Sequence, residues 1–194
     1  MLISILFLIL GKIYNLKLTT MPNHLSILGI IHTAISIIAI LAAIAALIKE
    51  GRINPLSSIG KSYIWLTVIT CLTALPIMKT GHLTAGHYVA ILILILLPIG
   101  IYAKQLRIFG KVADYVQVIL LSATIFFSCI PAIVETLTRV PISKPIAADA
   151  NAPIIQMGLN ILVVLFLAGI VYQVIKLRAK KKAVQTPTSS VKMG

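Results

Sequence analysis

Four histidines are the residues of this chain whose type and spacing could do chemistry. His24 and His32 stand at the head of one apolar run, and His82 and His87 stand at the head of another. Burying an imidazole in hydrocarbon without a partner is costly, so histidines that enter an apolar run are expected to face a partner or a cavity. Imidazole is also a ligand for haem iron, zinc and copper. The pattern therefore raises the hypothesis that the histidines meet around a ligand.

Two further pairs of polar residues accompany the histidines. Glu135 and Arg139 are four positions apart and therefore share one helix face. They predict either a boundary ion pair or an anion-binding arginine held by its glutamate. Gln156 and Asn160 have the same spacing at the start of the last apolar run. Such amides either bind helices to each other or line a cavity.

The elements that must position these residues are membrane helices. Hydrophobic residues make up 59% of the chain and charged residues 11%, far from the composition of soluble domains. The apolar runs have about the 20 residues that a spanning helix needs, and they do not alternate as the strands of a membrane barrel would. The sequence predicts an all-α polytopic membrane helix bundle with five transmembrane helices, at about 25–48, 62–79, 86–103, 115–137 and 154–177.

The predicted bundle occupies residues 21–178 and has a shorter segment on each side. Residues 1–20 contain the apolar stretch LISILFLIL, which is too short to span a membrane. This segment is either an interfacial helix or a start-site artefact, with Met21 as the true initiator. Residues 179–194 are basic and rich in Pro, Thr and Ser, which predicts a disordered tail.

Packing and anchoring residues also follow from the pattern. The first span carries small residues at three- and four-residue spacing that allow close helix contact, namely Ala39, Ala42, Ala43 and Ala46. Aromatic residues near the span ends are expected as interfacial anchors, namely Tyr63, Trp65, Tyr88 and Tyr102. Pro76, Pro98 and Pro131 are expected inside spans, where proline kinks a helix.

The basic residues predict an orientation in the cell membrane. The formal net charge is +13, and 12 of the 17 lysines and arginines fall on the side of the C-terminal tail under the predicted topology. By the positive-inside rule the C-terminus is cytoplasmic and the chain near Met21 is outside. The charge then contacts the lipid bilayer, with no nucleic-acid partner expected. All four histidines fall in the outer half, with His32 about 12 Å deeper than His24.

The first site hypothesis is haem b. Its two axial ligands must lie at similar depth on opposite sides of the iron, and His32 and His87 are the best-matched pair. His24 and His82, nearer the surface, and Arg139 would then assist with the haem propionates.

Two alternatives stay open beside haem. A zinc or copper ion could be bound by three or four of the histidines, with His32 and His87 among them, and by Glu135. The other alternative is that no ligand is bound, and each imidazole bonds a neighbouring carbonyl or hydroxyl, such as that of Thr33 or Thr84.

Other chemistry is not indicated by the sequence. HExxH and GxSxG motifs are absent, and so are phosphate loops and GxGxxG, which argues against zinc-peptidase, serine-hydrolase and nucleotide chemistry. Cys71 and Cys129 fall inside apolar runs without a CxxC pattern and are expected as buried free thiols.

The stretches HLSILGIIHTAIS and GKSYIWLTVITCLTALPIMKTGHLTAGHYVAILILILL carry a resemblance over about residues 21–103. They resemble small bacterial multi-pass membrane proteins of unknown function with cytochrome-b-like histidine placement. The resemblance implies a membrane redox or haem-associated role for His24, His32, His82 and His87. Dihaem b-type cytochromes usually spread their ligands over both membrane sides, whereas all the histidines here fall on one. One haem at most is therefore expected.

Two classes of function remain. The first is a haem- or metal-binding membrane protein that transfers electrons, with quinone or a membrane redox partner near the outer face. The second is a non-catalytic accessory subunit or a small transporter without a cofactor. A transporter needs a polar path to the cytoplasmic side, and the inner halves of the spans, such as SIIAILAAIAAL and LILILLPIG, offer few polar residues for it.

Overall fold

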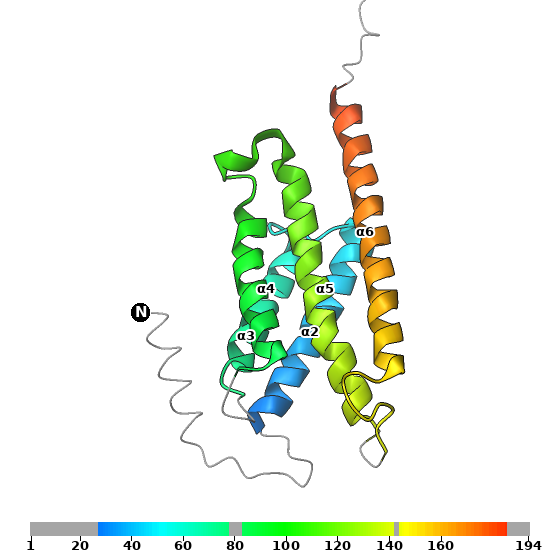
Figure 1. Cartoon of the computed structure of the whole chain (residues 1–194). Helices are drawn as coiled ribbons and strands as arrows, with labels where there is room; N and C mark the ends of the chain where they lie inside the picture. Colours follow the sequence, from blue (N-terminus) through cyan, green and yellow to red (C-terminus); the bar gives the residue numbers. More distant parts are fainter. Residues whose placement is uncertain (1–26, 78–82, 142–143, 186–194) are drawn as a thin grey trace, which may run out of the picture.

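The computed structural model describes residues 27–77, 83–141 and 144–185 of the 194-residue chain. Helices are the regular elements of this part, and no strand occurs in it, which confirms the predicted all-α class. Consecutive helices run in opposite directions through the bundle (Figure 1). The elements are α2 (Ile27–Glu50), α3 (Ser58–Ala74), α4 (Ala85–Tyr102), the 3-10 helix η1 (Arg107–Val112), α5 (Ala113–Arg139) and α6 (Pro153–Gln185).

Four of the described helices are long and apolar enough to cross a membrane. They are α2, α4, α5 together with η1, and α6. The chain is thus an integral membrane protein whose described part is helical. α3 has 17 residues and is the shortest α-helix of the described part. The count of five spans and the orientation of the termini stay predictions.

Two helix ends differ from the predicted spans. α3 ends at Ala74 instead of residue 79, because Pro76 has no backbone N–H to donate to the carbonyl of Leu72. The expectation of a kink at Pro76 within a helix was therefore wrong. α6 continues to Gln185, eight residues beyond the predicted limit. Lysine, arginine, alanine and glutamine are good helix formers, and lysines also suit a helix C-terminus.

Alanines on α2 allow it to pack closely against α3. Ala39, Ala43 and Ala46 are buried, as the small-residue pattern predicts. Ala43 and Ala46 belong to one core cluster with Tyr63 and Leu97. A methyl side chain lets helix backbones approach, which is how helices gain dispersion contacts where lipid supplies no hydrophobic driving force.

Glycines shape the joint between α2 and α3. Gly51 has a φ of +70°, the left-handed geometry that ends a helix. Gly60 lies in the first turn of α3, where its backbone N–H donates to Ser57 Oγ. A Cβ atom on Gly60 would lie 1.8 Å from the carbonyl oxygen of Asn54. The chain therefore crosses the start of α3 at a distance that only glycine allows.

Polar side chains join helices in the interior of the bundle. The Tyr63 hydroxyl donates to Thr124 Oγ1 at 2.8 Å, and Thr124 donates in turn to the carbonyl of Leu121. Tyr63 is thus a buried link between α3 and α5, so its prediction as an interfacial anchor was wrong. The amide of Gln117 donates to the carbonyls of Gly100 and Ile101, which have no hydrogen-bond donor within the last turn of α4.

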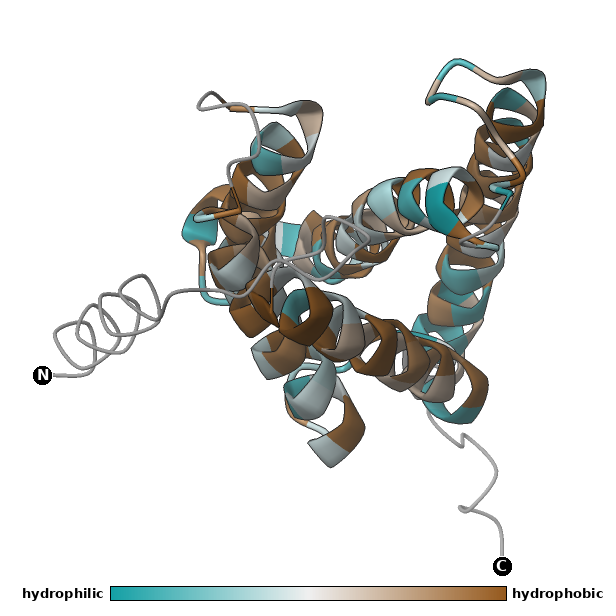
Figure 2. Ribbon diagram, turned by 90° about the horizontal axis from the view of Figure 1, so that it is seen from below, coloured by the Kyte–Doolittle hydropathy of each residue, from teal (hydrophilic) through white to brown (hydrophobic). Residues whose placement is uncertain are grey.

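α6 packs mainly against α5. Ser122 donates to Gln173 Oε1 at 3.1 Å, and the rings of Phe126 and Phe166 lie 4.7 Å apart. In the most apolar stretch of α6 only 6% of the residues are buried inside the protein, against 22–28% in the corresponding stretches of α2, α4 and α5. Hydrophobic residues (brown) recur along the helices of the bundle (Figure 2), and many large ones are exposed, among them Ile37 on α2 and Leu165 on α6.

The two ends of the bundle carry different groups. At one end Asp114 accepts from Lys104 at 2.7 Å and from Lys181 at 2.8 Å, which connects the turn after α4 with α5 and α6. We call this the lysine end. The opposite end carries His32 and His87, and we call it the histidine end.

Candidate functional site

His32 bridges α2 and α3 near the histidine end. Its Nδ1 lies 3.0 Å from the carbonyl oxygen of Thr70 and 3.1 Å from Thr73 Oγ1. A carbonyl oxygen only accepts, so Nδ1 carries the hydrogen and donates it. The Thr73 hydroxyl already donates to backbone carbonyls of its own helix and can accept from the imidazole.

This hydrogen bond fixes what the other ring nitrogen of His32 can do. With the hydrogen on Nδ1, the neutral ring has a free lone pair on Nε2. An imidazole bound to a metal through Nε2 commonly donates its Nδ1–H to a backbone carbonyl, which orients the ring and raises its basicity. His32 therefore has the arrangement of a histidine ligand.

His87 has the opposite arrangement. It is the third residue of α4, and the backbone N–H of Thr84 donates to its Nδ1 at 3.0 Å. The Thr84 side chain accepts in turn from the backbone N–H of His87, which completes a capping box at the start of the helix, and the Thr84 hydroxyl also lies 2.8 Å from Nδ1. Because Nδ1 accepts, the hydrogen of the ring is on Nε2. Among the described residues this buried Nε2 has no hydrogen-bond partner.

Glu135 and Arg139 form an ion pair in the last turns of α5. Both side chains are partly exposed, and both come from the same helix face, as their spacing predicts. The histidine end thus carries His32 on α2 and the Glu135–Arg139 pair on α5.

The structure does not join all the predicted site residues. In the described part of the chain no hydrogen bond connects the imidazoles of His32 and His87, and each binds threonines instead. No group of three or more His, Cys, Asp or Glu side chains that could hold a metal occurs in that part. His24 and His82 lie outside the described residues.

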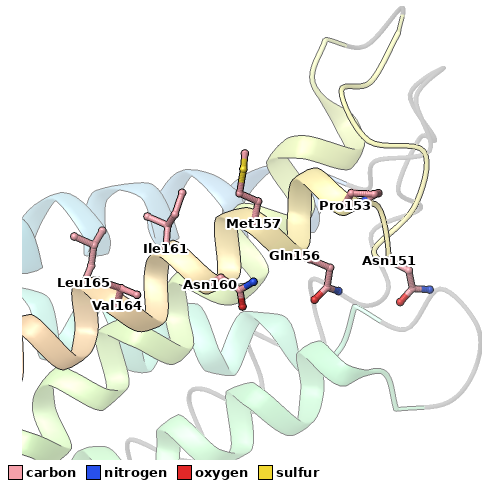
Figure 3. A pocket seen from close by; sticks show the side chains of 8 residues that line it. All are labelled: Asn151, Pro153, Gln156, Met157, Asn160, Ile161, Val164 and Leu165. Atoms are coloured by element: carbon pink, nitrogen blue, oxygen red, sulfur yellow. The ribbon is translucent and has the colours of Figure 1, made fainter.

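Gln156 and Asn160 line an open groove along α6 instead of facing the bundle interior. The groove has a volume of about 690 Å³. Figure 3 shows the two amides projecting to the same side of α6 from successive turns. The full set of lining residues is Asn151, Pro153, Gln156, Met157, Asn160, Ile161, Val164 and Leu165.

Sequence reasoning missed the partners of His32. Thr70 and Thr73 are three positions apart in the apolar run of α3, so they share one face of that helix. That spacing was a usable signal. The expected hydroxyl partner Thr33 instead donates to the carbonyl of Gly29 in its own helix. Thr84, by contrast, is the partner of His87 that the cofactor-free alternative named.

Known proteins give no further guidance on the site. The chain matches no family model, no curated protein and no solved structure.

Proposed function

We propose that this membrane protein binds haem b or a transition-metal ion at its histidine end, with His32 Nε2 as the protein ligand, and uses it in electron transfer. The observation that carries the proposal is the hydrogen bond from His32 Nδ1–H to the Thr70 carbonyl. That bond holds the imidazole in the tautomer that leaves Nε2 free.

Nearby charges fit such a ligand. The Arg139 guanidinium suits haem propionates or another anion, since it presents a planar fork of donors to a carboxylate. Glu135 lies at the same end of the bundle as His32 and would serve as a further oxygen ligand for a bare metal ion. A redox partner in the membrane, such as quinone, would exchange electrons at this end.

His87 would take a different role in this proposal. Ligation of iron by its Nε2 would require Nδ1 to become the protonated nitrogen and to give up the bond from the Thr84 N–H. A haem shared between His32 and His87 therefore implies a rearranged start of α4. Ligation by His32 alone needs no rearrangement.

Paired alanine variants test the proposal. The full chain, His32→Ala and His87→Ala would be produced with haem supplied, and absorption spectra of oxidised and reduced protein would be recorded with metal analysis. We expect a haem spectrum or bound metal in the full chain, its loss in His32→Ala, and its retention in His87→Ala. Circular dichroism of each variant would show that the helices are intact. A ligand-free full chain, or retention in His32→Ala, would contradict the proposal.

A second candidate is a cofactor-free accessory subunit of a membrane assembly. The observation in its favour is that threonines satisfy Nδ1 of both described histidines without any ligand. In that case His32 only ties α2 to α3. The same experiment separates the two candidates, because the accessory subunit would show no spectrum and no stoichiometric metal in any of the three proteins.

A further inference from the structure

We propose that α6 is the docking surface for a second copy of this chain, which pairs α6 with α6 in parallel. The proposal does not depend on the ligand at His32. Its basis is a seam of residues at alternating three- and four-residue spacing on α6. The seam residues are Met157, Asn160, Val164, Leu167 and Val171. This is the heptad spacing at which two helices pack side chains into each other's gaps.

The seam lies on the face of α6 that the bundle does not use. Ile155 and Gln173 mark the buried face toward α5. At about 100° per residue, the seam is centred on the opposite side of the helix. In the single chain its four apolar members are 56–64% exposed. A left-handed pair of helices would bury them. The open groove along α6 overlaps the first three seam residues (Figure 3).

Asn160 indicates which occupant fits the seam. It lies seven residues into a membrane-spanning helix, where lipid chains offer its exposed carboxamide no hydrogen bond. An amide has both donors and acceptors, so it is complementary to an identical amide. Two copies inserted in the same direction and related by a two-fold axis along the membrane normal would bring Asn160 opposite Asn160 at one depth.

A single polar residue in an otherwise apolar seam also sets its register. In coiled coils one asparagine at a core position selects the dimer and the parallel alignment, because any shift leaves its amide unpaired. Asn160 is the only polar member of the seam on α6. A second copy would therefore supply the hydrogen-bond partner of the Asn160 amide and cover the apolar seam. The same contact would align the two helices.

Cysteine cross-linking in native membranes tests the surface. Val164→Cys places a thiol on the seam, and Leu165→Cys is the matched control because both native side chains are 64% exposed at adjacent positions. Cys71 is buried and Cys129 is half-buried, so the parent chain measures the background. On mild oxidation we expect a disulfide-linked dimer from Val164→Cys well above the other two proteins. Equal yields from the two variants would overturn the proposal. Absence of a dimer from Val164→Cys would also overturn it, and this is the result expected if residues 1–20 cover the seam instead of a second copy.

A substitution of the amide measures its part in the pairing. Asn160→Ala would be compared with Leu165→Ala, which removes an exposed groove side chain off the seam, using energy transfer between labelled copies in phosphatidylcholine vesicles. We expect association of Asn160→Ala to be about 3- to 30-fold weaker than that of the parent chain, the range of interhelical polar contacts in membranes. Leu165→Ala should associate like the parent. Unchanged association of Asn160→Ala would overturn the assignment of Asn160 as the pairing residue.

Discussion

The four helices α2–α5 and the single helix α6 are held in different ways. The helices of the first group are joined by buried alanines, by the close approach of the Asn54 carbonyl to Gly60, and by the Tyr63–Thr124 hydrogen bond. α6 contacts mainly α5, through one hydrogen bond and one aromatic pair, and through an ion pair at the lysine end. The comparison indicates a packed unit that positions the histidine end and a peripheral helix whose free face is available to a partner.

Glycine substitutions should separate these two regions by the largest margin. In Gly60→Ala the new methyl group would overlap the Asn54 carbonyl oxygen, which belongs to the backbone and cannot rotate away. We expect a loss of about 3 kcal/mol in unfolding free energy, at the upper end of overpacking effects. The measurement is unfolding by SDS in mixed micelles, followed by circular dichroism.

Gly169→Ala on α6 is the matched control. The nearest atom to its new Cβ would be Gln173 Nε2 at 3.9 Å, an ordinary contact. Alanine is also the better helix former by about 1 kcal/mol. The control should be neutral or slightly stabilising. Equal destabilisation by the two substitutions would contradict the division into a packed unit and a peripheral helix.

Asp114→Asn should have a smaller effect and act on the attachment of α6. The substitution removes the charge that Lys104 and Lys181 share, together with a favourable charge in the first turn of α5. Because these side chains are partly exposed, we expect a loss of about 1 kcal/mol that shrinks at high salt. Asp149→Asn, at an exposed position outside the helices, is the control. A loss that does not vary with salt would count against an electrostatic attachment.

Arg139→Gln should have the smallest effect on stability. The Glu135–Arg139 pair is exposed and lies within one helix, so its removal should change the unfolding free energy by about 0–1 kcal/mol. If Arg139 binds a propionate or another anion, the variant should lose bound haem or anion faster during dialysis. Equal retention by variant and parent, followed by absorbance or metal content, would leave the pair as a boundary ion pair only.

The helices were largely predictable because their apolar runs are long. A run of about 20 apolar residues crosses a bilayer most favourably as a helix, so α2, α4, α5 and the start of α6 were located within a few residues. The alanine pattern also gave the correct packing face of α2. Helix ends were less predictable, since Pro76 stops α3 although the apolar run continues past it.

The site was only partly predictable, because tautomers depend on contacts between helices. The sequence could show that His32 lies within a span and that Glu135 and Arg139 share a face. It could not show that the Thr70 carbonyl faces His32 Nδ1, since that requires the packing of α2 on α3. The exposed position of Asn160 likewise depends on which face of α6 packs against α5.

The unequal lengths of α3 and α6 have a consequence for the surrounding lipid. At about 1.5 Å per residue, the 17 residues of α3 reach about 26 Å and the 33 residues of α6 about 50 Å, whereas a hydrocarbon core is about 30 Å thick. With α3 as the predicted fifth span, its short length would be relieved by thinning of the bilayer beside it. The last turns of α6 carry Arg178, Lys180, Lys181 and Lys182, so they would project beyond the hydrocarbon core. One flank of the molecule would therefore draw the leaflets together while the other would not.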